Sequence, residues 1–288
     1  MPEPRRLDAV LPLRAADCDR AEILFRSLEA LFAPLGTCYV VAPDEDVRAV
    51  HPCVPRGRYL VVPESDVIPE IGRFRTTARL RAKLRLIGPP IHGWYVQQLV
   101  KLAIAERIGT PFYLTLDADV ICVRPTRYED LVVDGRALVQ TTPPNHPEWN
   151  DDAERVLGLP RSGRQWGVTP AVLSVDAVRA LAAHLGGTTW RKFLLKSLPW
   201  TEYALYHTFL EQTGLFDRYH AHGGHDAIYS NCVWMESEFE DWDPAATRTP
   251  FSVVQSATRI PPERVAAKLS TAASSGRRSH ARSLASAE

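Results

Sequence analysis

The segment Pro111-Phe-Tyr-Leu-Thr-Leu-Asp-Ala-Asp-Val-Ile-Cys-Val-Arg-Pro125 joins a short apolar run to two closely spaced carboxylates, Asp117 and Asp119. The apolar run predicts a buried strand, and the acidic pair follows where that strand should end. Ligands of open parallel sheets bind beyond the carboxyl ends of the strands. Two carboxylates in such a place can hold a hard divalent cation against a diphosphate.

The Asp-x-Asp spacing alone does not select this pair. About one chance match is expected in a chain of this length, and three further pairs occur, at Asp17/Asp19, Asp44/Asp46 and Asp241/Asp243. Asp17 is a good candidate helix N-cap, and Asp241/Asp243 belongs to an acidic run typical of a solvated face. Asp44 follows a predicted strand, so it could face the same cleft as Asp117.

The residues after the acidic pair favour an extended chain. Val120-Ile-Cys-Val123 follows the pair, rather than a helix start. We therefore expect the chain to stay extended through Asp117 and Asp119, which would point both carboxylates to the same side.

The first part of the chain alternates short apolar runs with helical patterns. Strands are predicted at Leu7–Leu13, Cys38–Ala42 and Tyr59–Val62, with helices near Leu24–Phe32 and at Trp94–Arg107. This alternation predicts an α/β fold with a mostly parallel sheet flanked by helices.

The later part of the chain has more helical patterns. Strands are expected within 167–174 and 251–256, helices at 176–185, 200–211 and 261–269, and a loop at His220–His225. We expect residues 1–128 to form one half of a domain, residues 129–269 a second and more helical half, and residues 270–288 a disordered tail.

The composition excludes several classes of protein. Of 288 residues, 45% are hydrophobic, and Lys+Arg and Asp+Glu both number 34. With zero net charge the chain has no global basic field for nucleic acid or an anionic membrane. It shows no signal peptide and no transmembrane segment. Its five scattered cysteines match no zinc spacing and predict a reducing, cytoplasmic location.

The sequence resembles the nucleotide-sugar glycosyltransferases of the GT-A fold. The resemblance covers about residues 7–260 and rests on the strand and helix order, on Leu116-Asp-Ala-Asp-Val120, and on the helix starting Trp200-Thr-Glu-Tyr203. The run Gly93-Trp-Tyr-Val-Gln-Gln-Leu-Val-Lys101 also looks like a largely uncharacterised bacterial glycosyltransferase-like group. The resemblance implies a donor half that precedes an acceptor half.

The resemblance implies a metal and a donor site. Asp117 and Asp119 would hold Mn²⁺ or Mg²⁺ on the diphosphate of a nucleotide sugar, expected to be a UDP-sugar. A third ligand would come from nearer the C-terminus, with His222, His225 and Gln255 as candidates; we assign His222 to the metal and Gln255 to the donor. Other candidate donor contacts are Asp44, Gln98, and the cations Lys101, Arg73, Arg75 and Arg79, which could stabilise the departing diphosphate.

An inverting transferase also needs a general base for the acceptor hydroxyl. Glu202 is the first candidate, in the first turn of a predicted helix between aromatic residues, with Asp152 and Asp151 in reserve. A retaining enzyme would not need such a base. The acceptor would be a glycan or a small natural product, because Trp149, Trp166, Trp190, Trp200 and Tyr203 could stack on either. An oligomer is compatible with this interpretation.

Three other classes stay open. A phosphatase or phosphotransferase of the haloacid dehalogenase type would use Asp117 as a nucleophile, although its motif normally lies on the first strand. A nucleotidyltransferase shares the metal–diphosphate chemistry, but no Gly-rich loop follows Leu7–Leu13. A non-catalytic binding module would carry a degenerate site, whereas the acidic pair is intact here.

Overall fold

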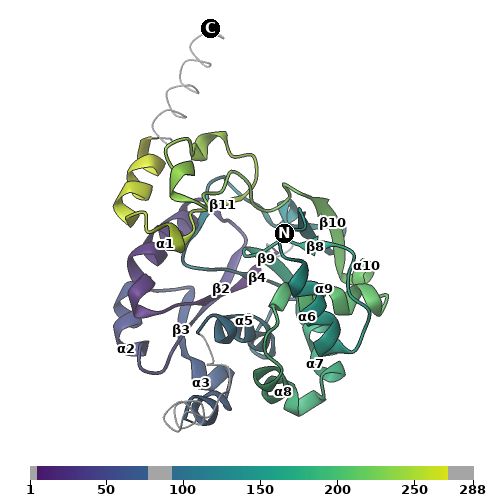
Figure 1. The fold of residues 1–288 in the computed structure, drawn as a ribbon. Coiled ribbons are helices and arrows are strands. Elements are labelled where there is room, and N and C mark those ends of the chain that lie inside the picture. Colours follow the sequence, from purple (N-terminus) through teal and green to yellow (C-terminus); the bar gives the residue numbers. More distant parts are fainter. Residues whose placement is uncertain (1–4, 77–92, 272–288) are drawn as a thin grey trace.

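The computed structural model describes residues 5–76 and 93–271. Its central sheet has the strand order β3-β2-β1-β4-β9 (Figure 1). These strands are β1 (Leu7–Pro12), β2 (Leu35–Ala42), β3 (Tyr59–Pro63), β4 (Phe112–Thr115) and β9 (Ala171–Ser174). The first four run parallel, and β9 is antiparallel to β4. The predicted mostly parallel sheet is confirmed.

Helices cover both faces of this sheet, because its strands are apolar on both sides. In β1, Leu11 packs into the core that contains α1 (Cys18–Leu31), whereas Val10 packs into the core that contains α5 (Gly93–Ala103). Successive side chains of a strand point to opposite faces, so α1 and α5 lie on opposite sides. The short helices α2 (Val47–Val50) and α3 (Glu64–Val67) follow β2 and β3.

The strand order reverses between β1 and β4. From β1 the chain moves outward to β2 and β3, and then returns through α5 to β4 on the other side of β1. Such a switch point opens a crevice at the carboxyl ends of the two strands. Asp117 and Asp119 follow β4 at this crevice.

A second, smaller sheet belongs to the later part of the chain. It consists of β6 (Val132–Val133), β7 (Arg136–Thr142), β8 (Gln165–Trp166) and β10 (His220–Gly224). The helices of this part are α6 (Pro147–Leu157), α7 (Val175–His184), α8 (Trp190–Lys196), α9 (Glu202–Gln212) and α10 (Phe216–Tyr219).

The loop predicted at His220–His225 is wrong, because most of it is strand β10, parallel to β7. His220 is fully buried there, with its ring nitrogens 2.7 Å from the hydroxyl of Tyr206 and 3.2 Å from the carbonyl oxygen of Ala137. A strand satisfies the backbone of this buried segment through its ladder, which a loop would not do.

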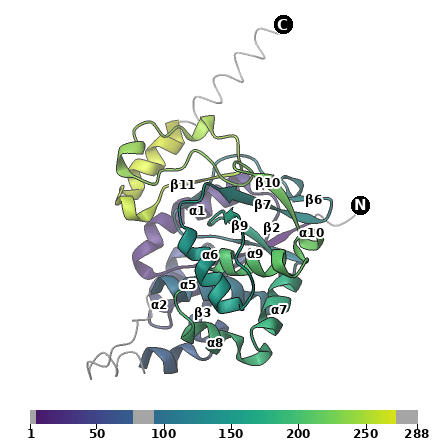
Figure 2. The ribbon, with the colours of Figure 1, turned by 45° about the vertical axis from the view of Figure 1, so that its right-hand side comes forward.

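The C-terminal part returns to the first half of the chain. Strand β11 (Phe251–Val253) pairs antiparallel with β5 (Val120–Cys122), directly after the acidic pair. Residues 262–271 are helical and lie beside α1, where Arg20 donates to the carbonyl of Ile260 (Figure 2). Most of the tail predicted at 270–288 lies outside the described residues. Within the described ranges, no helix combines the length and the apolar character that crossing a membrane requires.

Candidate active site

A cavity of about 780 Å³ opens at the carboxyl end of β4. Lys101, Asp117 and Asp119 line it from the first part of the chain, and Glu202 and Gln255 line it from the later part. Five of the residues that the sequence singles out therefore meet in one space, although they come from four separate segments.

The acidic pair does not lie on an extended segment, so that prediction is wrong. The amide of Val120 donates to the carbonyl of Asp117 at 3.1 Å, which closes a turn over Ala118 and Asp119. The turn is needed because β5 leaves the central sheet to pair with β11. The two carboxylates consequently have different partners, although both face the cavity.

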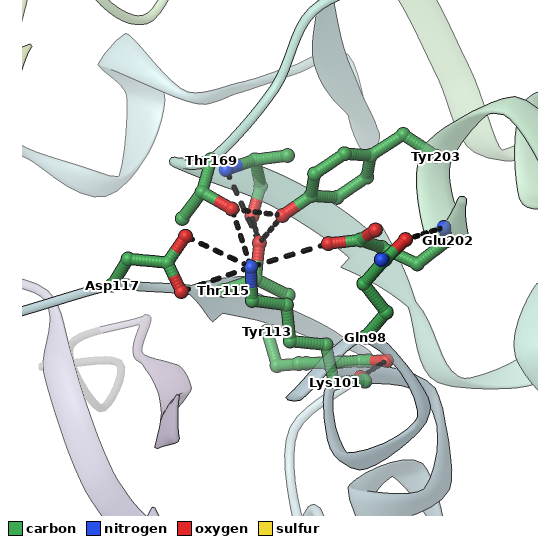
Figure 3. A network of polar contacts seen from close by, with 9 residues as sticks. Gln98, Lys101, Tyr113, Thr115, Asp117, Thr169, Glu202 and Tyr203 are labelled. Carbon is green, nitrogen blue, oxygen red and sulfur yellow. Dashed lines mark hydrogen bonds and ion pairs between the residues drawn. The ribbon is translucent and has the colours of Figure 1, made fainter. Parts of the chain in front are cut away.

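Lys101 is the centre of a buried polar network (Figure 3). Its ammonium nitrogen lies 3.0 Å from each carboxylate oxygen of Asp117, 3.1 Å from Oε1 of Glu202 and 2.6 Å from Oγ1 of Thr169. A lysine ammonium has three hydrogens to donate. All of them are directed to these partners, on a side chain that is almost fully buried.

A second layer of hydroxyl groups fixes this network. The hydroxyl of Tyr203 lies 2.7 Å from Oγ1 of Thr115 and 2.8 Å from Oγ1 of Thr169 (Figure 3). Tyr113 donates to the carbonyl of Lys101 at 2.8 Å, which ties α5 to β4. The ammonium therefore sits in a rigid cage with satisfied partners.

Burial and charge shift the pKa values of these groups. Burial alone would lower the pKa of Lys101, but the carboxylates of Asp117 and Glu202 outweigh it and raise the pKa, so the ammonium stays charged. Burial raises the pKa of Glu202; the ammonium of Lys101 opposes this shift, and Asp117 adds to it. A raised pKa makes a carboxylate a stronger base, which general-base catalysis requires.

Asp119 is held by the C-terminal part of the chain. The amide of Ser256 donates to its Oδ2 at 2.9 Å, and the amide of Val254 donates to its backbone carbonyl at 3.1 Å. Burial, followed by the charge of Asp117, raises the pKa of Asp119 to about 6, against the effect of the Ser256 amide. A cation bound between the two carboxylates would relieve this repulsion.

The oxygen donors fit a hard divalent cation. Asp117, Asp119 and the side-chain amide of Gln255 all face the cavity. Within 5–76 and 93–271, no group of three or more His, Cys, Asp or Glu side chains is arranged to hold a metal by itself. Magnesium commonly binds through one or two carboxylates together with substrate phosphates and water. Two carboxylates therefore suffice if a diphosphate completes the shell.

Several predicted residues do not line the cavity. The carboxylate of Asp44 accepts hydrogen bonds from Ser65, and that of Asp152 pairs with Arg155 at 3.1 Å. His222 lies on β10 and stacks on Phe216 at 4.5 Å. None of these three predicted residues is brought to the acidic pair.

The remaining predicted residues have other surroundings. Gln98 lies behind the cavity wall, where its Oε1 accepts a hydrogen bond from the amide of Glu202 at 3.0 Å. Arg75 pairs with the buried Glu64 at 2.7 Å. Arg79 lies outside the described residues. The contacts with the donor that the sequence predicts for Gln98 and Arg79 therefore stay predictions.

Some residues of the cavity wall were not predicted from the sequence to have a role at the site. Thr169 and Gln165 line the cavity, but single polar residues carry no pattern that identifies them; Thr201 also lines it, and belongs to the Trp200–Tyr203 run without having been given a role there. Thr169 precedes Pro170, and this peptide bond is cis in the structure. Thr169 reaches Lys101 because the chain bends there between β8 and β9.

A family model described as a family of unknown function, DUF6492, matches residues 4–276. The chain belongs to this family. No curated protein matches this DUF6492 member. Among solved structures, the galactosyltransferase LgtC in complex with donor and acceptor sugar analogues is similar, with a TM-score of 0.49 and 12% sequence identity; the match covers 92% of this chain and 96% of that chain.

Proposed function

We propose that this DUF6492 protein is a metal-dependent glycosyltransferase that moves a sugar from a nucleotide-diphosphate donor, such as a UDP-sugar, to a hydroxyl-bearing acceptor. The observation that carries the proposal is the meeting of Asp117, Asp119 and Glu202 in one cavity at the switch point of a parallel sheet. A pair of carboxylates for a cation and a separate buried carboxylate for a proton are the groups that sugar transfer needs.

The division of the cavity supports a donor side and an acceptor side. Asp117 and Asp119 come from residues 1–128, the proposed donor half, and would hold Mn²⁺ or Mg²⁺. The bound cation would neutralise the negative charge that develops on the departing diphosphate. Glu202 comes from residues 129–269, the proposed acceptor half.

Glu202 would act as the general base. In the transfer, the acceptor oxygen forms a bond to the anomeric carbon while the bond from that carbon to the diphosphate oxygen breaks. The acceptor proton passes to Glu202, and the bonding electrons leave with the diphosphate. Burial raises the pKa of Glu202, which makes its carboxylate a stronger base for this role.

Lys101 would position these groups and would not itself bind phosphate. Its three donor positions are occupied by Asp117, Thr169 and Glu202. A phosphate contact would require one of these buried partners to be released, which costs the hydrogen bond of a charged group. The ammonium instead holds the proposed cation ligand and the proposed base at a fixed separation.

Thermal unfolding with nucleotides tests the proposal. UDP, GDP, ADP and the corresponding nucleotide sugars are added with and without Mn²⁺, to the native protein and to Asp119→Ala. Asp241→Ala is the matched control, because its carboxylate has the same Asp-x-Asp spacing but does not line the cavity.

We expect a nucleoside diphosphate to raise the melting temperature only with Mn²⁺, in the native protein and in Asp241→Ala but not in Asp119→Ala. Turnover of a phosphomonoester, without a response to any nucleotide, would contradict the proposal and would favour a phosphatase. Release of pyrophosphate from a nucleoside triphosphate would favour a nucleotidyltransferase.

A further inference from the structure

Three residues that line the cavity each carry a buried polar atom without a hydrogen-bond partner within the described residues. These atoms are Oε1 of Gln165, Nε1 of Trp166 and Oγ1 of Thr201. These residues are only 6%, 2% and 7% exposed, and all three line the cavity. Buried polar atoms are almost always paired, so an unpaired group of them beside a cavity points to a ligand.

Thr201 shows most clearly that this wall is not built for stability alone. It stands at the N-cap of α9, where a threonine hydroxyl ordinarily accepts a hydrogen bond from the first turn. Here the hydroxyl accepts no capping bond from the first turn, and the amide of Glu202 donates to Oε1 of Gln98. The amides of Tyr203 and Ala204 have no partner inside the helix, as at every helix start, and both residues line the cavity.

The charges around this wall favour a neutral ligand. Glu202 belongs to the wall itself, and Asp117 and Asp119 face the same cavity. Lys101 cannot offset an added anion there, because its ammonium already pairs with Asp117 and Glu202. The unpaired atoms include an acceptor, a donor and a hydroxyl that can do both. Neutral hydroxyl groups, which both donate and accept, satisfy such a mixed set.

An aromatic face borders the same space. Trp149 and His146 stack with ring centroids 4.2 Å apart, and both residues line the cavity. Trp149 is half-buried, with its ring against His146 and the core, so that its exposed part borders the cavity, whereas Trp166, Trp200 and Tyr203 are buried. Helix α6, which carries Trp149, packs against α9, and so does β8. The hydroxyl-binding wall and the aromatic face are therefore neighbours.

We propose that Trp149, Gln165 and Thr201 form the acceptor subsite and that the acceptor is a saccharide. A sugar ring has a flat face of C–H groups for the indole and an edge of hydroxyl groups for the unpaired polar atoms. An aromatic or alkyl alcohol would use the indole but would leave those atoms buried without partners. The inference rests on the proposed function, because it places the acceptor hydroxyl next to Glu202.

Ligand-detected NMR tests the inference in the presence of UDP and Mn²⁺. The saccharide probes are maltose, lactose and chitobiose, and the apolar hydroxylated probes are 2-naphthol and 1-hexanol. The variants are Thr201→Val, Gln165→Leu and Trp149→Ala. The controls are Gln212→Leu, an exposed amide at the other end of α9, and Phe193→Ala, an exposed aromatic outside the cavity.

We expect at least one disaccharide to bind, and each of the three variants to weaken that binding about five- to tenfold, as the loss of one hydrogen bond or one stacking contact does. The two control variants should bind the disaccharide like the native protein. Thr201→Val should melt at the same or a higher temperature, because it removes an unpaired buried hydroxyl.

Failure of the inference and failure of the proposed function give different results. If UDP and Mn²⁺ bind but only 2-naphthol or 1-hexanol binds beside them, or no probe does, the saccharide subsite is wrong and the donor site stands. Unchanged disaccharide binding in all three variants would also overturn the subsite. If the disaccharide binds as expected but no nucleotide does, the subsite stands and the proposed transferase function fails.

Discussion

The ammonium of Lys101 and the carboxylate of Glu202 lie 3.1 Å apart, although the two residues are 101 positions apart in the sequence. Both side chains are almost completely buried, and the same ammonium also binds Asp117. A buried charge is tolerated only when it is paired. The charge states of Asp117 and Glu202 therefore both depend on the ammonium of Lys101.

Replacement of Lys101 by methionine should destabilise the protein strongly. The change leaves Glu202 buried without its cation, and breaking a buried ion pair in this way costs about 3–5 kcal/mol. We expect that loss in the free energy of unfolding by urea at pH 7.5. It should shrink as the pH is lowered, because burial raises the pKa of Glu202 and its protonated form needs no cation. Lys192→Met, at an exposed lysine, is the control, and equal stability of the two variants would contradict the role of Lys101.

The pKa of Asp119 predicts a pH dependence of stability in metal-free buffer. Its folded-state pKa of about 6 lies above its ordinary value of 3.8, so the folded state binds the proton more tightly than the unfolded state. The resulting stability is fully present below pH 3.8 and is lost as the pH rises through about 6.

Asp119→Asn should remove this dependence. Relative to the native protein in EDTA, the variant should gain stability between pH 4 and pH 7. Added Mn²⁺ at pH 7 should stabilise only the native protein and so reverse the order. Parallel pH profiles of the two proteins in urea unfolding would show that Asp119 does not titrate in this range.

Glu202→Gln should separate binding from turnover. The amide keeps the shape of the side chain but cannot accept the acceptor proton, and the loss of a general base lowers the rate about 10²- to 10⁴-fold. Stabilisation by UDP and Mn²⁺ should remain. Glu263→Gln, at an exposed position on the C-terminal helix, is the control for sugar transfer. A Glu202 variant with near-native turnover would exclude it as the base.

Tyr203→Phe should loosen the cage around Lys101. The variant removes a hydroxyl that lies 2.7 Å from Thr115 and 2.8 Å from Thr169 and leaves their buried oxygens with fewer partners. A loss of about 1–3 kcal/mol is expected in the free energy of unfolding. Tyr219→Phe removes a hydroxyl that is not part of this network and should have a smaller effect; the opposite order would contradict the proposed cage.

The sequence was sufficient for the central sheet and for the position of the acidic pair. Apolar runs of the right length mark β1 and β4, and the helical period marks α5, because these patterns are local. The pairing of Lys101 with Glu202 could not be predicted from the sequence, because it depends on how α9 packs against α5. The turn at Ala118 was also missed, since it exists only because β5 pairs with a distant strand.

Residues of the later part of the chain were harder to place. His222 was predicted beside the metal, but it lies on β10 against Phe216. Gln255 was predicted as a donor contact, and it does line the cavity. The difference is physical: Gln255 follows a strand that pairs with the acidic segment, whereas the position of His222 depends on a second sheet that local periodicity does not reveal.

The hydrogen bonds from the amides of Val254 and Ser256 to Asp119 affect how the protein folds during its synthesis. The acidic loop is made less than halfway along the chain, but its anchoring amides are added about 135 residues later. A nascent chain that has already folded its central sheet would therefore still carry an unanchored loop. We expect the proposed cation site to mature only after residues 254–256 leave the ribosome, so that a truncated translation product would be folded in part and would not bind Mn²⁺.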